Sequence, residues 1–126
     1  MVIHQSAEDY LESILALEER LGHGQVHSID IVNRLGFSKP SVSIAMKNLR
    51  ENGYIKVGEG GFITLEPSGM AIASKIYERH TLFSNWLVNL GVDPKTAAED
   101  ACRIEHVISD ESFDALKRHV VENNEI

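Results

Sequence analysis

The residues best suited to chemistry in this 126-residue chain are carboxylate, imidazole and thiol side chains at helical spacings. Cys102, Glu105 and His106 stand at positions i, i+3 and i+4, which share one face of a helix. Asp9 and Glu12 are three residues apart and would share a face in the same way. Donors of these types, grouped on helix faces, are what a divalent metal ion requires. The spacing makes these five residues candidate metal ligands.

A sixth candidate ligand, His80, stands between the two clusters among apolar residues of a predicted helix. Each candidate also has an ordinary structural interpretation. Asp9 and Glu12 would then be solvated helix charges, and Cys102 a small buried hydrophobic residue. His80 would be an exposed histidine or one whose hydrogen bonds are satisfied within the protein. The i, i+3, i+4 triplet is more specific than any single residue, although mixed polar triplets also arise by chance.

The overall composition excludes several classes of protein. With 43% hydrophobic and 25% charged residues, the chain is neither disordered nor a fibrous repeat. No apolar run reaches the roughly 18–20 residues of a membrane span, and the first residues lack the features of a secretory signal. A single cysteine cannot form an internal disulfide, which fits a reducing compartment. We therefore expect a cytoplasmic protein that does not associate with membranes.

The charge distribution is uneven along the chain. A formal net charge of −7 argues against non-specific coating of nucleic acid. Residues 27–60 nevertheless carry five basic and three acidic residues, whereas the segments before and after them are net acidic. Taken alone, this net-positive block is either an ordinary solvated surface or a surface that contacts nucleic acid.

Caps, glycines and apolar periodicity predict the elements that position these residues. Ser6, Ser28 and Ser38 are suited to cap the first three helices, and the run of glycines between YIKV and FITL predicts a hairpin. Apolar spacing predicts three further helices after the hairpin. The helices expected from these signals are residues 7–21, 29–35, 39–52, 67–90, 94–107 and 110 onward.

Two short helices joined by a glycine-containing turn and followed by a hairpin form a winged helix-turn-helix. We predict a mainly α-helical protein, with a winged helix-turn-helix DNA-binding domain in residues 1–74. An all-helical domain for metal binding and dimerisation would follow in residues 75–126. The helix at 39–52 would enter the major groove of double-stranded DNA. The expected DNA contacts are Ser38, Lys39, Pro40, Ser41, Ser43, Lys47 and Arg50.

Dimerisation is expected because small winged-helix proteins usually read two half-sites. The long helix that begins at Pro67 also offers more apolar side chains than one helix needs. We therefore expect a homodimer formed through residues after about 75. The side chains expected to be exposed for this contact are Leu82, Phe83, Trp86, Leu87 and Val88.

Four stretches of the sequence resemble the diphtheria-toxin-repressor family of metal-dependent bacterial repressors. They are SAEDYLESILALEE, FSKPSVS, YERH and DACRIEHVISDE, and the last is the most specific because it combines ligand-type residues with unremarkable ones. The resemblance implies a winged-helix domain, a helical dimerisation domain and metal ligands drawn from both. It places Cys102, Glu105 and His106 on ligand positions, and His80 on the histidine of the long helix.

Within that family, the chain is most similar to the two-domain manganese-sensing branch. The resemblance implies that Asp9 and Glu12 are the N-terminal acids of that branch, whereas iron-sensing members have methionine in place of Asp9. Ser84 and Ala98 stand where the iron branch has a glutamate and a histidine for its accessory site, so that site is not expected here. Cys102 departs from the manganese branch, which commonly has a carboxylate there. The SH3-like third domain of longer members is not expected within these 126 residues, and a shortened form of a longer member would look the same.

These observations predict a metal-activated transcriptional repressor that controls metal homeostasis genes. Asp9, Glu12, Glu105 and a Cys102 thiolate would repel one another in one pocket, and two divalent ions per subunit would balance their charge. Carboxylates and imidazoles favour Mn(II), whereas the thiolate favours Fe(II) or Zn(II). We expect Mn(II) or Fe(II) as the cofactor, with the metal-loaded dimer binding its operator.

Three other functions remain open from the sequence. A winged-helix regulator that answers an organic effector would need an apolar pocket and no metal. A metalloenzyme is disfavoured because the chain has no HExxH and no readable Ser/His/Asp arrangement, so we expect no enzymatic activity. A protein-interaction module that does not bind DNA would be insensitive to changes at Lys47 and Arg50.

Overall fold

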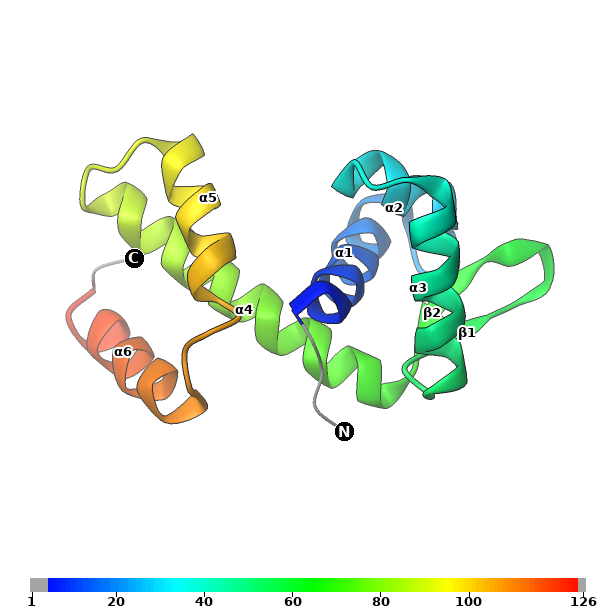
Figure 1. Ribbon diagram of the computed structural model, residues 1–126. Helices are drawn as coiled ribbons and strands as arrows, with labels where there is room; N and C mark the ends of the chain where they lie inside the picture. The colour runs from blue at the N-terminus through cyan, green and yellow to red at the C-terminus, as the bar shows by residue number, and fades with distance from the viewer. Residues whose placement is uncertain (1–4, 125–126) are drawn as a thin grey trace. The chain divides into compact units, whose positions relative to one another are not determined.

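The computed structural model describes residues 5–124 and divides the chain into two compact units. The N-terminal unit runs to Lys75 and the C-terminal unit begins at Ile76. The helices and strands of the first unit are α1 (Gln5–Leu21), α2 (Ser28–Leu35), α3 (Lys39–Glu51), β1 (Ile55–Val57), the short 3-10 turn η1 (Glu59–Gly61), β2 (Ile63–Leu65) and the start of α4 (Pro67–Asn89) (Figure 1).

The caps of the first three helices only partly follow the prediction. Ser38 caps α3 as expected, because its side-chain oxygen accepts a hydrogen bond from the backbone N–H of Ser41 at 3.2 Å. Ser28 does not cap α2 but is its first residue. The cap is His27, whose backbone N–H donates to the Asp30 carboxylate at 2.9 Å. Ser6, expected to cap α1, lies inside its first turn.

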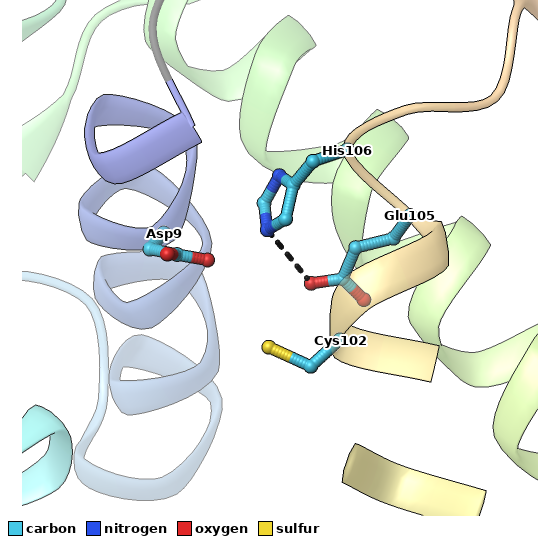
Figure 2. Close-up of side chains that lie close together, drawn as sticks. All are labelled: Asp9, Cys102, Glu105 and His106. Carbon is cyan, nitrogen blue, oxygen red and sulfur yellow. Dashed lines mark ion pairs between the residues drawn. The ribbon is translucent and has the colours of Figure 1, made fainter. Parts of the chain in front are cut away.

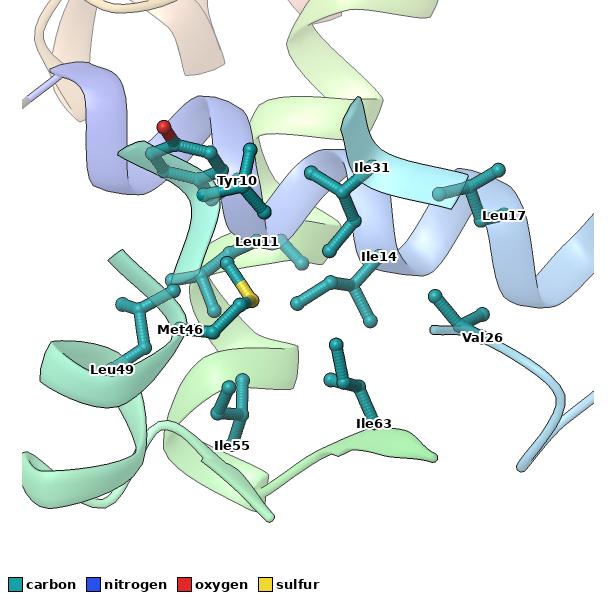
Figure 3. Packing of buried hydrophobic residues seen from close by; sticks show 12 residues of the cluster. Tyr10, Leu11, Ile14, Leu17, Val26, Ile31, Met46, Leu49, Ile55 and Ile63 are labelled. Carbon is teal, nitrogen blue, oxygen red and sulfur yellow. The ribbon is translucent and has the colours of Figure 1, made fainter. Parts of the chain in front are cut away.

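In the N-terminal unit, buried side chains of α1, of α3 and of the hairpin pack together in one hydrophobic core (Figure 3). Its side chains come from every helix of the unit and from both strands. They are Tyr10, Leu11, Ile14, Leu17, Val26, Ile31, Val42, Met46, Leu49, Ile55, Ile63 and Ala73. Because these side chains are buried, the core fixes which face of α3 is turned to solvent.

The predicted hairpin is confirmed as the wing of the winged helix-turn-helix. Strands β1 and β2 pair antiparallel, with Lys56 opposite Thr64. Gly60, at φ +81° within the connecting turn, adopts a left-handed conformation that glycine tolerates best. The backbone N–H of Ile63 also donates to the carbonyl of Val26 at 2.7 Å, which ties the wing to the segment before α2.

The C-terminal unit contains the rest of α4 together with α5 (Pro94–Ile104) and α6 (Asp110–Glu122). Asp93 and Ser109 cap α5 and α6 through their side chains. Helix α5 ends three residues before the predicted Val107. A second core contains Leu82, Phe83, Ala101 and Phe113. None of the helices within residues 5–124 is long and apolar enough to cross a membrane.

The side chains expected to be exposed for dimerisation are only partly so. Leu82 and Phe83 are 5% and 4% exposed, because α5 and α6 pack against that face of α4. The prediction that these two residues are exposed is therefore wrong. Trp86 and Leu87 are half-buried, and Val88 is exposed as expected.

Candidate nucleic-acid interface and metal centre

Helix α3 separates its side chains between the core and solvent. Val42, Met46 and Leu49 are buried on one side of the helix. In contrast, the residues predicted to contact DNA are all exposed, and they are Ser38, Lys39, Pro40, Ser41, Ser43, Lys47 and Arg50. A helix face that carries hydroxyl groups and lysines, next to a wing, is suited to contact the phosphates and base edges of DNA.

Ile44 also lies on this surface, although it is not among the residues predicted to contact DNA. Its side chain is 62% exposed, and it stands three residues from both Ser41 and Lys47 on α3. An exposed apolar side chain on a helix that enters the major groove is suited to contact the methyl group of thymine. The predicted contacts were all chosen for polar groups or for the helix start, which is why an apolar residue was not among them.

The C-terminal unit brings three predicted metal ligands together at the end of α5. Cys102 lies in the last turn of α5, and Glu105, the C-cap residue, and His106 follow the helix directly (Figure 2). One ligand atom from each of Cys102, Glu105 and His106 lies within 4.8 Å of the others. Nε2 of His106 is 3.4 Å from Oε1 of Glu105. Cys102 is exposed, so its interpretation as a buried hydrophobic residue is wrong.

His80 on α4 joins this group through Glu105. Its Nδ1 lies 2.8 Å from Oε2 of Glu105, while Oε1 faces His106. The Glu105 side chain is only 1% exposed, and a buried carboxylate requires compensating charge or hydrogen bonds. The four residues therefore form a cluster of one carboxylate, two imidazoles and one thiol, which we call the Glu105 cluster.

The remaining two predicted ligands, Asp9 and Glu12, belong to the N-terminal unit. Both stand on α1, and both side chains are partly buried. Burial, with a smaller contribution from the Asp9 carboxylate, raises the pKa of Tyr10 above its ordinary value. Tyr10 therefore stays protonated at physiological pH.

Both parts of the chain match known protein families. Residues 3–60 match the N-terminal DNA-binding domain of iron-dependent repressors. Residues 66–123 match the metal-binding and dimerisation domain of the same proteins.

Curated relatives and solved structures agree with these matches. The transcriptional regulator MntR of Salmonella typhimurium is 36% identical over 109 residues, which cover 86% of this chain and 68% of the relative. An uncharacterised HTH-type regulator of Methanocaldococcus jannaschii, MJ0568, is 36% identical over 115 residues, or 90% of each chain. A solved manganese-dependent transcriptional repressor in complex with manganese superimposes with a TM-score of 0.77 at 28% identity. The alignment covers 90% of this chain and about half, 52%, of that structure.

The matches confirm the predicted fold class, in which a winged helix-turn-helix precedes a helical dimerisation domain. They also confirm a DNA-binding regulator that is not an enzyme. The chain therefore belongs to the iron-dependent repressor family, the group of metal-dependent transcriptional regulators that its sequence resembles.

Proposed function

We propose that this protein is a homodimeric repressor that binds operator DNA when it is loaded with Mn(II) or Fe(II). The observation that carries the proposal is the Glu105 cluster, in which a buried carboxylate lies between two imidazoles beside a thiol. A regulator of this type acts on the chromosome, so we place it in the cytoplasm. The ligands that we propose are Asp9, Glu12, His80, Cys102, Glu105 and His106.

The geometry of the Glu105 cluster fits a divalent transition metal. Ligand bonds to such metals are about 2.0–2.3 Å, so two ligands of one ion lie no more than roughly 4–5 Å apart. The ligand atoms of Cys102, Glu105 and His106 already satisfy this limit. When bound, the metal supplies the positive charge that allows a buried carboxylate and a thiolate to remain ionised side by side.

The acids on α1 provide the proposed connection to DNA binding. Leu11 stands between Asp9 and Glu12 in the sequence, and its side chain lies in the same core as Met46 of α3. Fixing the two carboxylates therefore fixes α1, and through the core it fixes the exposed face of α3. We propose that the acids of α1 and the Glu105 cluster share the bound metal. A coupling of about 1–3 kcal/mol between metal and DNA binding is sufficient for such control.

The donor set favours Mn(II), with Fe(II) as the second candidate. Three carboxylates and two imidazoles are hard or intermediate ligands that suit Mn(II). The Cys102 thiolate shifts the preference toward Fe(II). Two of the proteins to which this chain is similar are named as manganese regulators or contain manganese, which supports the same choice.

Selection of DNA from a random pool tests this function. The purified chain is mixed with the pool in the presence of Mn(II), of Fe(II) without oxygen, or of a chelator. We expect a two-fold symmetric sequence to be enriched with metal and not with chelator. Enrichment that is equal with and without chelator would support a regulator that answers an organic effector. No enrichment in any sample would support an interaction module.

Lys47 tests whether the exposed face of α3 is the DNA-binding surface. Replacing Lys47 with alanine should weaken binding to every DNA sequence and lower the salt slope of binding by about 1, because one phosphate contact is lost. Fluorescence anisotropy at several salt concentrations measures both quantities. Lys95→Ala, which removes an exposed lysine at the start of α5, is the control and should change neither. An unchanged slope in Lys47→Ala would show that this lysine does not contact phosphate.

A further inference from the structure

Arg79 is a buried cation beside the Glu105 cluster that the sequence interpretation did not identify. It is 5% exposed and precedes His80 on α4. Its Nη1 donates to the backbone carbonyl of Glu105 at 3.1 Å and to that of Ile108 at 2.7 Å. Its Nη2 donates to the Asp110 carboxylate at 2.5 Å, and the guanidinium lies 5.4 Å from the centre of the Phe113 ring.

These contacts hold the segment that carries two of the proposed ligands. Glu105 and Ile108 both follow Ile104, where α5 ends, so their carbonyl groups lie outside any helix ladder and need other partners. The guanidinium supplies those partners. Through Asp110 and Phe113 it also holds the first turns of α6. One side chain of α4 therefore fixes both ends of the connection between α5 and α6.

Two successive residues of α4 contact Glu105 in complementary ways. Arg79 binds its backbone carbonyl, whereas His80 contacts its carboxylate. The main chain and the side chain of Glu105 are therefore both set from the same turn of α4. We propose that Arg79 is a positioning residue, which fixes the proposed metal ligands Glu105 and His106 without binding the metal itself. This inference rests on the proposed metal site.

The chemistry of arginine explains why this position requires it. A guanidinium is planar, remains charged when buried, and presents several N–H donors in a fixed fork. Here the fork reaches two carbonyls and one carboxylate at once. A lysine ammonium keeps the charge but is a single point on a flexible stem, so it cannot reproduce this geometry.

Arg79→Lys tests the inference with Co(II) as a spectroscopic probe. We expect Co(II) affinity to fall roughly tenfold or more, the usual cost of losing a group that orients metal ligands. At saturating Co(II), the visible absorption bands should also shift, because the ligands bind with altered geometry. A merely structural role would lower the melting temperature but leave the spectrum of the loaded protein unchanged. Arg103→Lys, in an exposed ion pair with Asp100, is the control and should match the unmodified protein.

Asp110→Ala provides an independent test that leaves the arginine in place. Removing this carboxylate frees one arm of the guanidinium, so we expect a two- to fivefold loss of Co(II) affinity with a smaller band shift. Glu111→Ala, which removes the adjacent exposed acid in the same turn, is its control and should have no effect. Circular dichroism shows whether each variant folds, and Asp110→Ala decides the question if Arg79→Lys does not.

The outcomes separate the inference from the function on which it rests. If the unmodified protein does not bind Co(II), the metal site itself is wrong. If the unmodified protein binds Co(II) and the folded Arg79 and Asp110 variants have the same affinity and spectrum, only the positioning role is wrong.

Discussion

Replacing Glu105 with glutamine is expected to abolish metal-activated DNA binding at metal concentrations that saturate the unmodified protein. The carboxylate is buried, and its two oxygens face His80 and His106 at 2.8 and 3.4 Å. Glutamine keeps the size of the side chain but removes the charge, so the central anionic ligand is lost. Loss of a group that only orients ligands costs 10–100-fold in metal affinity, and we expect at least about 100-fold here. Electron paramagnetic resonance of free Mn(II) measures the affinity.

The control for this experiment is the same substitution elsewhere on α5. Glu99 is exposed on that helix, so Glu99→Gln should leave Mn(II) affinity and DNA binding unchanged. Circular dichroism and sedimentation should show that Glu105→Gln is folded and dimeric. Normal Mn(II) affinity in folded Glu105→Gln would remove the Glu105 cluster from the metal site.

The second large effect expected is an exchange of metal preference between two ligand variants. Asp9→Met replaces a hard anionic donor with a soft neutral one, which should eliminate Mn(II)-activated DNA binding and retain Fe(II)-activated binding. Cys102→Glu should have the opposite effect, because it creates a site of oxygen and nitrogen donors only. Anaerobic titrations of binding to the selected DNA give the midpoints for both metals.

Cys102→Ala shows whether Cys102 binds the metal or only packs against its neighbours. The exposed thiol makes few demands on packing, so a change in the activation midpoints identifies it as a ligand. Unchanged midpoints in Cys102→Ala would exclude the thiol from the metal site. Midpoints for Mn(II) and Fe(II) that shift in parallel in Asp9→Met and Cys102→Glu would contradict the selectivity argument and leave metal activation intact.

Local signals in the sequence predicted most of the fold. Ser38, Asp93 and Ser109 cap their helices because a cap depends on residues two or three positions away. The prediction was wrong at Ser28, where the Asp30 carboxylate instead binds the backbone of His27 and moves the cap back by one residue. Apolar periodicity identified the face of α4 that contains Phe83. Periodicity does not reveal which part of the protein covers that face. In the structure α5 and α6 cover it, where the sequence had suggested a second subunit.

The same distinction applies to the site. The spacing of Cys102, Glu105 and His106 was informative because the three are local neighbours at i, i+3 and i+4, around the point where α5 ends. The contact between His80 and Glu105 joins residues 25 positions apart, so the sequence could name His80 as a candidate ligand but helical spacing could not pair it with Glu105. The positioning role of Arg79, which lies within the YERH stretch, could not be predicted, because two of its partners are backbone carbonyls, which no pattern of side chains records.

The central claim is that the metal site and the DNA-binding surface are coupled, and the Mn(II) affinity measured with and without DNA tests it most directly. Coupling between two binding sites is reciprocal, so each ligand must change the affinity of the other by the same factor. Mn(II) should raise affinity for the selected DNA by roughly 5–150-fold, and saturating DNA should raise Mn(II) affinity by that same factor. An Mn(II) affinity that is identical in the presence and absence of this DNA would contradict the claim.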